Sequence, residues 1–283
     1  MVAPLDEIRT RIQTTLQRTL IGDEPPRDLS KGRADNGLFG PQSVTWRVHQ
    51  DASMLIGGIR ALLLQTMHPL AMAGVAQHSA YKDDPFGRLR RTSRYVGDVS
   101  FAPTEEALAA IALVKRVHGR VRGTAPDGRA YSANDAHLLA WVHHALVDSF
   151  LRSYQQYGSE ALCVEDADQY VLEQSTLAEL IGAVSPPPAR SVAELRLWLR
   201  AIRPEMNSTR EARDAAFFLL SVPMPATMAV PYGVLLSAAI GLLPRFVRQG
   251  LWLPTSQLAT KALVAPTARA ITRTLGWAMS APR

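Results

Sequence analysis

Apolar residues recur at helical spacing along most of the chain. Between residues 51 and 67, for example, Met54, Leu55, Ile59, Leu62 and Leu63 fall on one face of a helix with 3.6 residues per turn. The same periodicity predicts further helices over 1–20, 86–99, 104–122, 132–157, 161–184, 191–202, 208–220, 230–243 and 255–277. The sequence contains no run of alternating β-branched residues bounded by turns. We therefore expect an all-α fold.

Local signals mark where these helices begin and where the chain breaks. Pro85 after Asp84, and Thr104 followed by two glutamates, are typical helix starts. Residues 123–134 are expected to form a loop, 185–188 a stiff proline-rich break, and 24–42 an irregular segment. Short links and many helices indicate a single domain. We divide it into an N-terminal helix with the irregular segment (1–42), a main domain (43–253) and a C-terminal helix packing on it (254–283).

Composition narrows the function classes. The chain has 283 residues, of which 47% are hydrophobic, and a net charge of +6. Its basic residues are dispersed rather than gathered in a stripe, so nucleic-acid binding is not expected. The lone cysteine, Cys163, excludes an intrachain disulfide and a CxxC zinc motif. The expected role of a lone cysteine is that of a small buried apolar side chain.

Two segments bear on membranes. The amphipathic segment 1–20 lacks the continuous apolar run of a signal peptide. Residues 215–244 are weakly charged but contain four prolines, which favours a buried core helix over a spanning one. The alternative is a surface that docks on a membrane or admits an apolar substrate. We expect a cytoplasmic protein with a candidate membrane contact over 215–253.

Six of the seven histidines lie between residues 68 and 144: His68, His78, His118, His137, His143 and His144. Neutral imidazole is a common ligand of metals and haem iron, although any single histidine is more often a structural residue. His118 lies on an apolar face, and His68 lies at a helix junction before Pro69. Of the neighbours His143 and His144, we expect only one to face inward. His137 is expected to be exposed.

A second polar set lies on the predicted helix 86–99. Arg88, Arg91 and Thr92 have i, i+3, i+4 spacing and therefore share one face. Two guanidinium groups beside a hydroxyl suit a carboxylate or phosphate, but a salt-bridged surface helix fits the spacing equally well. The sequence has no dinucleotide-binding, serine-hydrolase or zinc-protease motif, and the pair Gly57-Gly58 is typical of close helix packing.

At these residues the chain resembles the DUF2236 family, which includes the latex-clearing (rubber) oxygenases and the fungal mycophenolic-acid-pathway oxygenase. The resemblance rests on an ordered set of segments that covers roughly residues 40 to 250: Gly57–Gln65, His68-Pro69, His78-Ser79, Asp84-Pro85, Gly87–Thr92, Arg116–His118 and Trp141–His143 through Asp148-Ser149.

The resemblance implies a globin-like helical core and b-type haem iron, as in the rubber oxygenases. His118 matches the family histidine that ligates iron, and Arg122 the arginine four residues later. Arg88, Arg91 and Thr92 match an Arg-Lys-Thr set, so Arg91 replaces the lysine on the distal side of the haem. The catalytic glutamate of the rubber oxygenases is assigned to no residue of this sequence. The resemblance thus implies haem binding without rubber cleavage.

The leading hypothesis is a haem-dependent oxygenase that uses O₂ on an apolar, isoprenoid-like substrate. In one alternative, His68, His78 and His143 hold a non-haem iron. In another, the protein is a non-catalytic helical protein that binds lipid or another apolar ligand. The sequence gives no expectation for the oligomeric state.

Overall fold

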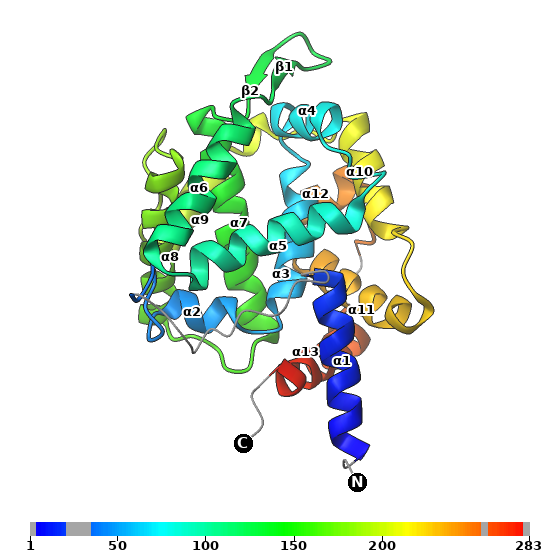
Figure 1. Ribbon diagram of the computed structural model, residues 1–283. Coiled ribbons are helices and arrows are strands. Elements are labelled where there is room, and N and C mark those ends of the chain that lie inside the picture. The colour runs from blue at the N-terminus through cyan, green and yellow to red at the C-terminus, as the bar shows by residue number, and fades with distance from the viewer. Residues whose placement is uncertain (1–3, 21–34, 256–259, 280–283) are drawn as a thin grey trace.

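The computed structural model describes residues 4–20, 35–255 and 260–279, and this part of the chain is predominantly helical (Figure 1). The α-helices are α1 (Pro4–Leu20), α2 (Val44–His49), α3 (Met54–Gln65), α4 (Pro69–His78), α5 (Pro85–Phe101), α6 (Thr104–His118), α7 (Ala136–Tyr157), α8 (Val164–Ile181), α9 (Val192–Ala201), α10 (Arg210–Leu220), α11 (Ala226–Leu242), α12 (Arg245–Gly250) and α13 (Ala265–Met279). A 3₁₀ turn (Arg203–Glu205), a π-helical turn (Thr260–Val264) and strands β1 (Arg122–Thr124) and β2 (Ala130–Ser132) complete the described elements.

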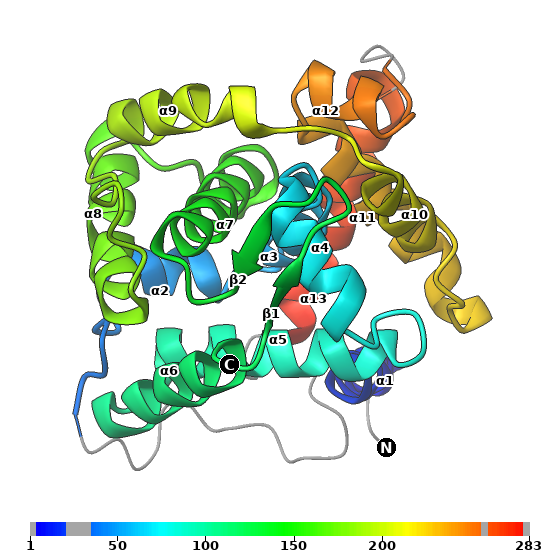
Figure 2. The same ribbon diagram turned by 90° about the horizontal axis from the view of Figure 1, so that it is seen from above.

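The pair α3 and α7 forms the centre of the fold. Gly57 allows their close approach, because a Cβ atom there would lie 2.8 Å from Cδ1 of Phe150 and 3.2 Å from the carbonyl oxygen of Ser149. The predicted packing role of the glycine pair therefore holds for Gly57. Seen from above, α5 and α6 lie on one side of α7 and α9 on the opposite side (Figure 2). The α5–α6 pair thus covers one face of the central helices.

The predicted all-α class is confirmed, and so are most of the predicted helices. Asp84 caps α5, since its Oδ1 accepts a hydrogen bond from the Gly87 amide at 2.8 Å, and Pro85 occupies the first turn. The Ser185–Pro188 break separates α8 from α9 as expected. The sequence pattern missed three short helices, α2, α4 and α12, because six to ten residues give too little periodicity to detect.

Two predictions around residue 120 are wrong. Helix α6 ends at His118 rather than near Arg122, and the expected loop 123–134 contains an antiparallel hairpin in which Arg122 is paired with Ser132. Gly128 adopts a φ of +86° in the turn of this hairpin. Three-residue strands are too short to show a recognisable alternation, so the sequence pattern could not reveal them.

Other corrections concern single residues. Cys163 is exposed, not buried, and its sulfur caps the start of α8 by accepting from the Asp166 amide. Helix α11 starts at Ala226 and continues through Pro231, whereas the pattern predicted a start at 230. His143 and His144 are both buried, because α7 is enclosed on several sides.

The structure describes the two ends of the chain only in part. Of the predicted helix 1–20, residues 1–3 lie outside the described residues, and the remainder forms α1. Of the predicted irregular segment 24–42, residues 24–34 lie outside the described residues, and 35–42 form neither helix nor strand. Residues 256–259 of the predicted helix 255–277 also lie outside them, and the remainder forms the π-helical turn and α13. Within the described ranges, no helix has the length and apolar character needed to cross a membrane.

Candidate functional site

A large cavity lies beneath α5 and α6, against α3 and α7. Its volume is about 2460 Å³, well above the roughly 300–1,000 Å³ of a site for one drug-sized ligand. The wall is mainly apolar, and it includes Gly58 of α3, where a Cβ atom would meet nothing within 4 Å. Leu113 and Val117 of α6 also line it, and each is 53% exposed. Such a cavity suits a large ligand with extensive apolar surface.

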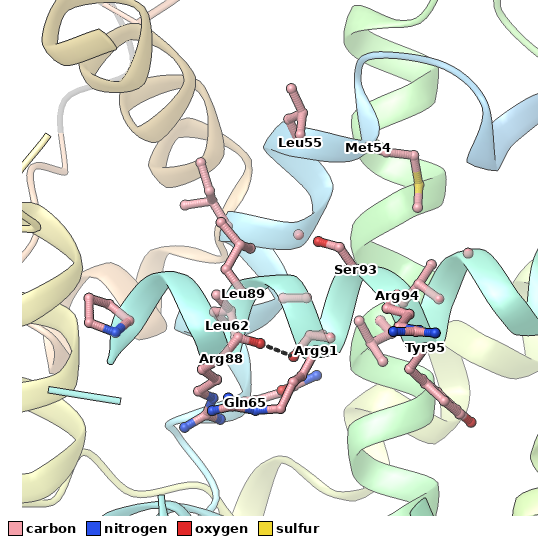
Figure 3. A pocket seen from close by; sticks show the side chains of 18 of the residues that line it. Met54, Leu55, Leu62, Gln65, Arg88, Leu89, Arg91, Ser93, Arg94 and Tyr95 are labelled. Carbon is pink, nitrogen blue, oxygen red and sulfur yellow. Dashed lines mark hydrogen bonds between the residues drawn. The ribbon is translucent and has the colours of Figure 1, made fainter. Parts of the chain in front are cut away.

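Arg88 brings a positive charge into this apolar wall. Its side chain extends from α5 to the same side as that of Arg91 (Figure 3). Nη1 of Arg88 donates to Oγ of Ser79 at 2.7 Å, and the guanidinium lies 5.8 Å from the centre of the Tyr81 ring. Burial lowers the pKa of Arg88, although arginine stays protonated at neutral pH. A guanidinium held by a hydroxyl and an aromatic ring can still accept an anionic partner.

Arg91 and Thr92 differ from Arg88 in their surroundings, although all three line the cavity. Arg91 is 68% exposed and forms a long 3.4 Å ion pair with Asp84. The hydroxyl of Thr92 donates to the carbonyl oxygen of Arg88 at 3.0 Å. Arg90 is absent from the wall, whereas Arg94 lines the cavity with a side chain that is 57% exposed.

His118, the last residue of α6, lines the cavity. Its Nδ1 atom is buried without a hydrogen-bond partner. Burial lowers the pKa of this imidazole, which keeps it neutral near pH 7. Neutral imidazole with an unshared electron pair is the form that binds metals. Arg122 does not share this wall, because α6 has ended and Arg122 lies on β1.

His143 reaches the same cavity from α7. Burial lowers its pKa to about 3, an effect reinforced by His144 and opposed by a hydrogen bond with the main chain of Gln174. His144 has a different role, since it stacks on Trp198 at 4.3 Å and its Nε2 accepts from the Ala189 amide at 3.0 Å. His143 is therefore another neutral imidazole at the cavity, which His49 also lines.

His78 and His68 have separate environments. His78 lines the cavity and contacts the Tyr131 hydroxyl at 3.1 Å. His68 is buried at the junction before α4, as predicted, but it is not part of the cavity wall. Across the described ranges, the one group of three metal-ligating side chains that converges contains His68, His137 and Glu205. The structure therefore does not bring together His68, His78 and His143, the set considered for non-haem iron.

Sequence reasoning missed several partners of these residues. Ser79 and Tyr81, which hold Arg88, lie in a segment without helical periodicity, and Glu205 follows His68 by 137 residues. His137 was expected to be exposed, and its side chain is 39% exposed, but its contact with Glu205 was not foreseen. No local signal in the sequence connects such residues, because the fold alone sets their proximity.

The comparisons with known proteins agree with the resemblance seen in the sequence. Residues 46–277 match the family described as the ER-bound oxygenase mpaB/B'/rubber oxygenase catalytic domain. Because this match covers most of the 283 residues, the chain belongs to that oxygenase family. No curated protein and no solved structure matches the chain.

Proposed function

We propose that the protein is a haem-dependent oxygenase that acts on an apolar substrate. The observation that carries the proposal is the unpartnered, buried Nδ1 atom of His118 at the wall of a large apolar cavity. A buried polar atom is normally satisfied, so this one calls for an explanation. The family match supports the oxygenase class, and the proposal adds the cofactor and the kind of substrate.

The residues of the cavity fit a haem group. His118 would supply the neutral imidazole ligand, and His143 is the alternative ligand. Arg88, with Arg91 nearby on α5, would pair with the carboxylates of the haem or donate a hydrogen bond to O₂. Haem iron, when bound, supplies the site that binds and activates O₂. The protein's own part is to hold the group, to keep His118 neutral and to exclude water with an apolar wall.

The apolar part of the wall near α10 and α11 indicates that the substrate is apolar. Phe218 and Leu219 of α10 line the cavity there, as does Val222 in the link to α11. Phe217 and Val230 are 70% and 75% exposed. An apolar molecule would meet exposed apolar side chains beside the cavity wall. We propose that the region 215–253 admits the substrate and contacts a membrane surface in doing so.

The test is an absorption spectrum of the purified protein after expression with haem supply and after addition of haemin. We expect a Soret band that the substitution His118→Ala abolishes or strongly shifts, and that His143→Ala retains. No Soret band in the wild type would contradict haem binding. A band lost in His143→Ala and unchanged in His118→Ala would assign the ligand to His143.

The same cavity also suits the second candidate function, a non-catalytic protein that binds lipid. Its volume and apolar wall would serve a lipid without any metal. Metal analysis and mass spectrometry of organic extracts separate the two. Copurified lipid with neither iron nor a tetrapyrrole favours lipid binding, whereas equimolar iron with protoporphyrin favours the oxygenase.

A further inference from the structure

Three side chains from distant parts of the chain converge outside the cavity. His68 precedes α4, His137 lies in the first turn of α7, and Glu205 ends the 3₁₀ turn between α9 and α10. One potential ligand atom of each lies within 4.8 Å of the other two. None of the three belongs to the cavity wall that contains His118.

The distances within this His68–His137–Glu205 cluster suit a small cation. Nε2 of His137 lies 3.0 Å and 2.9 Å from the two carboxylate oxygens of Glu205, and Nε2 of His68 lies 3.4 Å from one of them. Two ligands on a tetrahedral zinc ion, each about 2.0–2.2 Å from the metal, lie roughly 3.3 Å apart. Side-chain adjustments alone would therefore bring the three atoms into one coordination sphere.

His68 is unlike two other deeply buried histidines of the protein. His49 contacts the Ser100 hydroxyl at 2.6 Å and the Tyr170 hydroxyl at 2.9 Å, so both of its nitrogens have partners. Both nitrogens of His144 also have partners. His68 is only 1% exposed, yet its Nδ1 has no partner and its Nε2 has only the long contact to Glu205. Ordinary hydrogen bonding therefore leaves this buried imidazole poorly satisfied.

The electrostatic surroundings also permit a cation. Glu205 contributes a carboxylate, and the neighbouring Arg129 is paired with Asp127 through two hydrogen bonds of 3.0 Å and 2.7 Å. Glu205 borders a recess of about 470 Å³ that Asp127 and Arg129 also line. This recess would give a bound ion access to water or to a small ligand at a fourth position.

We propose that His68, His137 and Glu205 form a binding site for a divalent transition-metal ion, with Zn²⁺ as the best match. Two histidines and one glutamate, with a fourth position open to solvent, are a known zinc ligand set. The site is independent of the haem proposal, because it shares no residue with the cavity. A bound ion would link the starts of α4 and α7 to the segment that joins α9 to α10.

The test is calorimetric titration of chelator-treated full-length protein with Zn²⁺, followed by absorption spectroscopy with Co²⁺. We expect one ion per chain. The substitutions Glu205→Gln and His137→Asn should each weaken binding by about 100-fold or more, since even loss of a residue that only supports a ligand costs about 10–100-fold. Both side chains are about 40% exposed, so these variants should fold, which circular dichroism would verify.

Asp214→Asn, on the exposed surface of α10, is the matched control and should bind Zn²⁺ like the wild type. His118→Ala should also retain Zn²⁺ binding, which separates this site from the haem site. Absence of saturable 1:1 binding by the wild type would overturn the proposal. Equal affinity of the wild type, Glu205→Gln and His137→Asn would do the same, because it would place the ion elsewhere.

Discussion

Nη2 of Arg60 donates a hydrogen bond to Oδ2 of Asp148 at 2.7 Å, and the two side chains are only 1% and 7% exposed. The same guanidinium donates to the Ser149 hydroxyl and to the carbonyl oxygen of Leu242, so one side chain joins α3 to α7 and α11. Asp148 also accepts from Arg152 at 2.7 Å. The central helices that form the floor of the cavity are therefore held by a buried charged network.

Removing the carboxylate from this network should destabilise the protein strongly. We expect Asp148→Ala to lower the free energy of unfolding by about 3–5 kcal/mol, because Arg60 would remain charged and unpaired in the interior. Urea denaturation followed by circular dichroism measures the change. The control is Asp166→Ala, which removes the exposed partner of Arg47 and should cost less than about 1 kcal/mol. Equal effects of the two substitutions would contradict the prediction.

The adjacent glycines of α3 should respond oppositely to alanine. At Gly57 the new methyl group would meet main-chain atoms of Ser149 and Phe150 at 3.2 Å, so we expect a loss of about 1–3 kcal/mol. At Gly58 nothing lies within 4 Å, and alanine should stabilise the helix by about 0.5–1 kcal/mol. Thermal and urea denaturation of both variants would check this. A loss of stability in Gly58→Ala would contradict the prediction, because it would show that the added methyl group clashes with neighbouring atoms.

Two buried histidines should make stability depend on pH. Burial lowers the pKa values of His49 and His143 to about 3 in the folded protein, against about 6.5 when unfolded. The unfolded chain therefore binds more protons below pH 6.5, so stability is complete above that pH and falls as the pH drops toward 3. Each histidine should contribute a slope of about 1.4 kcal/mol per pH unit in this window.

Urea denaturation at pH 7.5, 6.0 and 5.0 would measure this slope. His49→Gln should reduce this slope by the contribution of one histidine, about 1.4 kcal/mol per pH unit. Stability that stays constant between pH 7.5 and 5.0 would show that these imidazoles are accessible to protons.

The half-buried guanidinium of Arg88 on α5 should contribute to haem affinity. We expect Arg88→Met to raise the dissociation constant for haemin about 10-fold or more, because one charge-assisted hydrogen bond is worth about 1.5–3 kcal/mol. Arg90→Met changes the same residue type on the same helix outside the cavity wall, and it should leave the affinity unchanged. Titration of the Soret absorbance compares the two, and equal affinities would remove Arg88 from the haem site.

The sequence predicted which types of residue form the candidate site and their order along the chain. It did not predict where each helix ends. Spacing placed Arg88, Arg91 and Thr92 on one face of a helix, and all three line the cavity. Spacing also suggested that Arg122 follows His118 by one helical turn, but Gly119 ends the helix and a hairpin carries Arg122 away. A helix end depends on how the following residues pack, which periodicity does not encode.

The amphipathic pattern by itself determined the all-α class and the approximate positions of the longer helices, because burial of an apolar stripe repeats every 3.6 residues wherever a helix packs. The order of the motifs likewise pointed to the oxygenase family. Only the tertiary structure decided which histidines meet which partners. It separated His118 and His143 at the cavity from His68 and His137 beside Glu205. Contacts between residues 68 to 137 positions apart depend on how helices pack in three dimensions, so no local pattern could specify them.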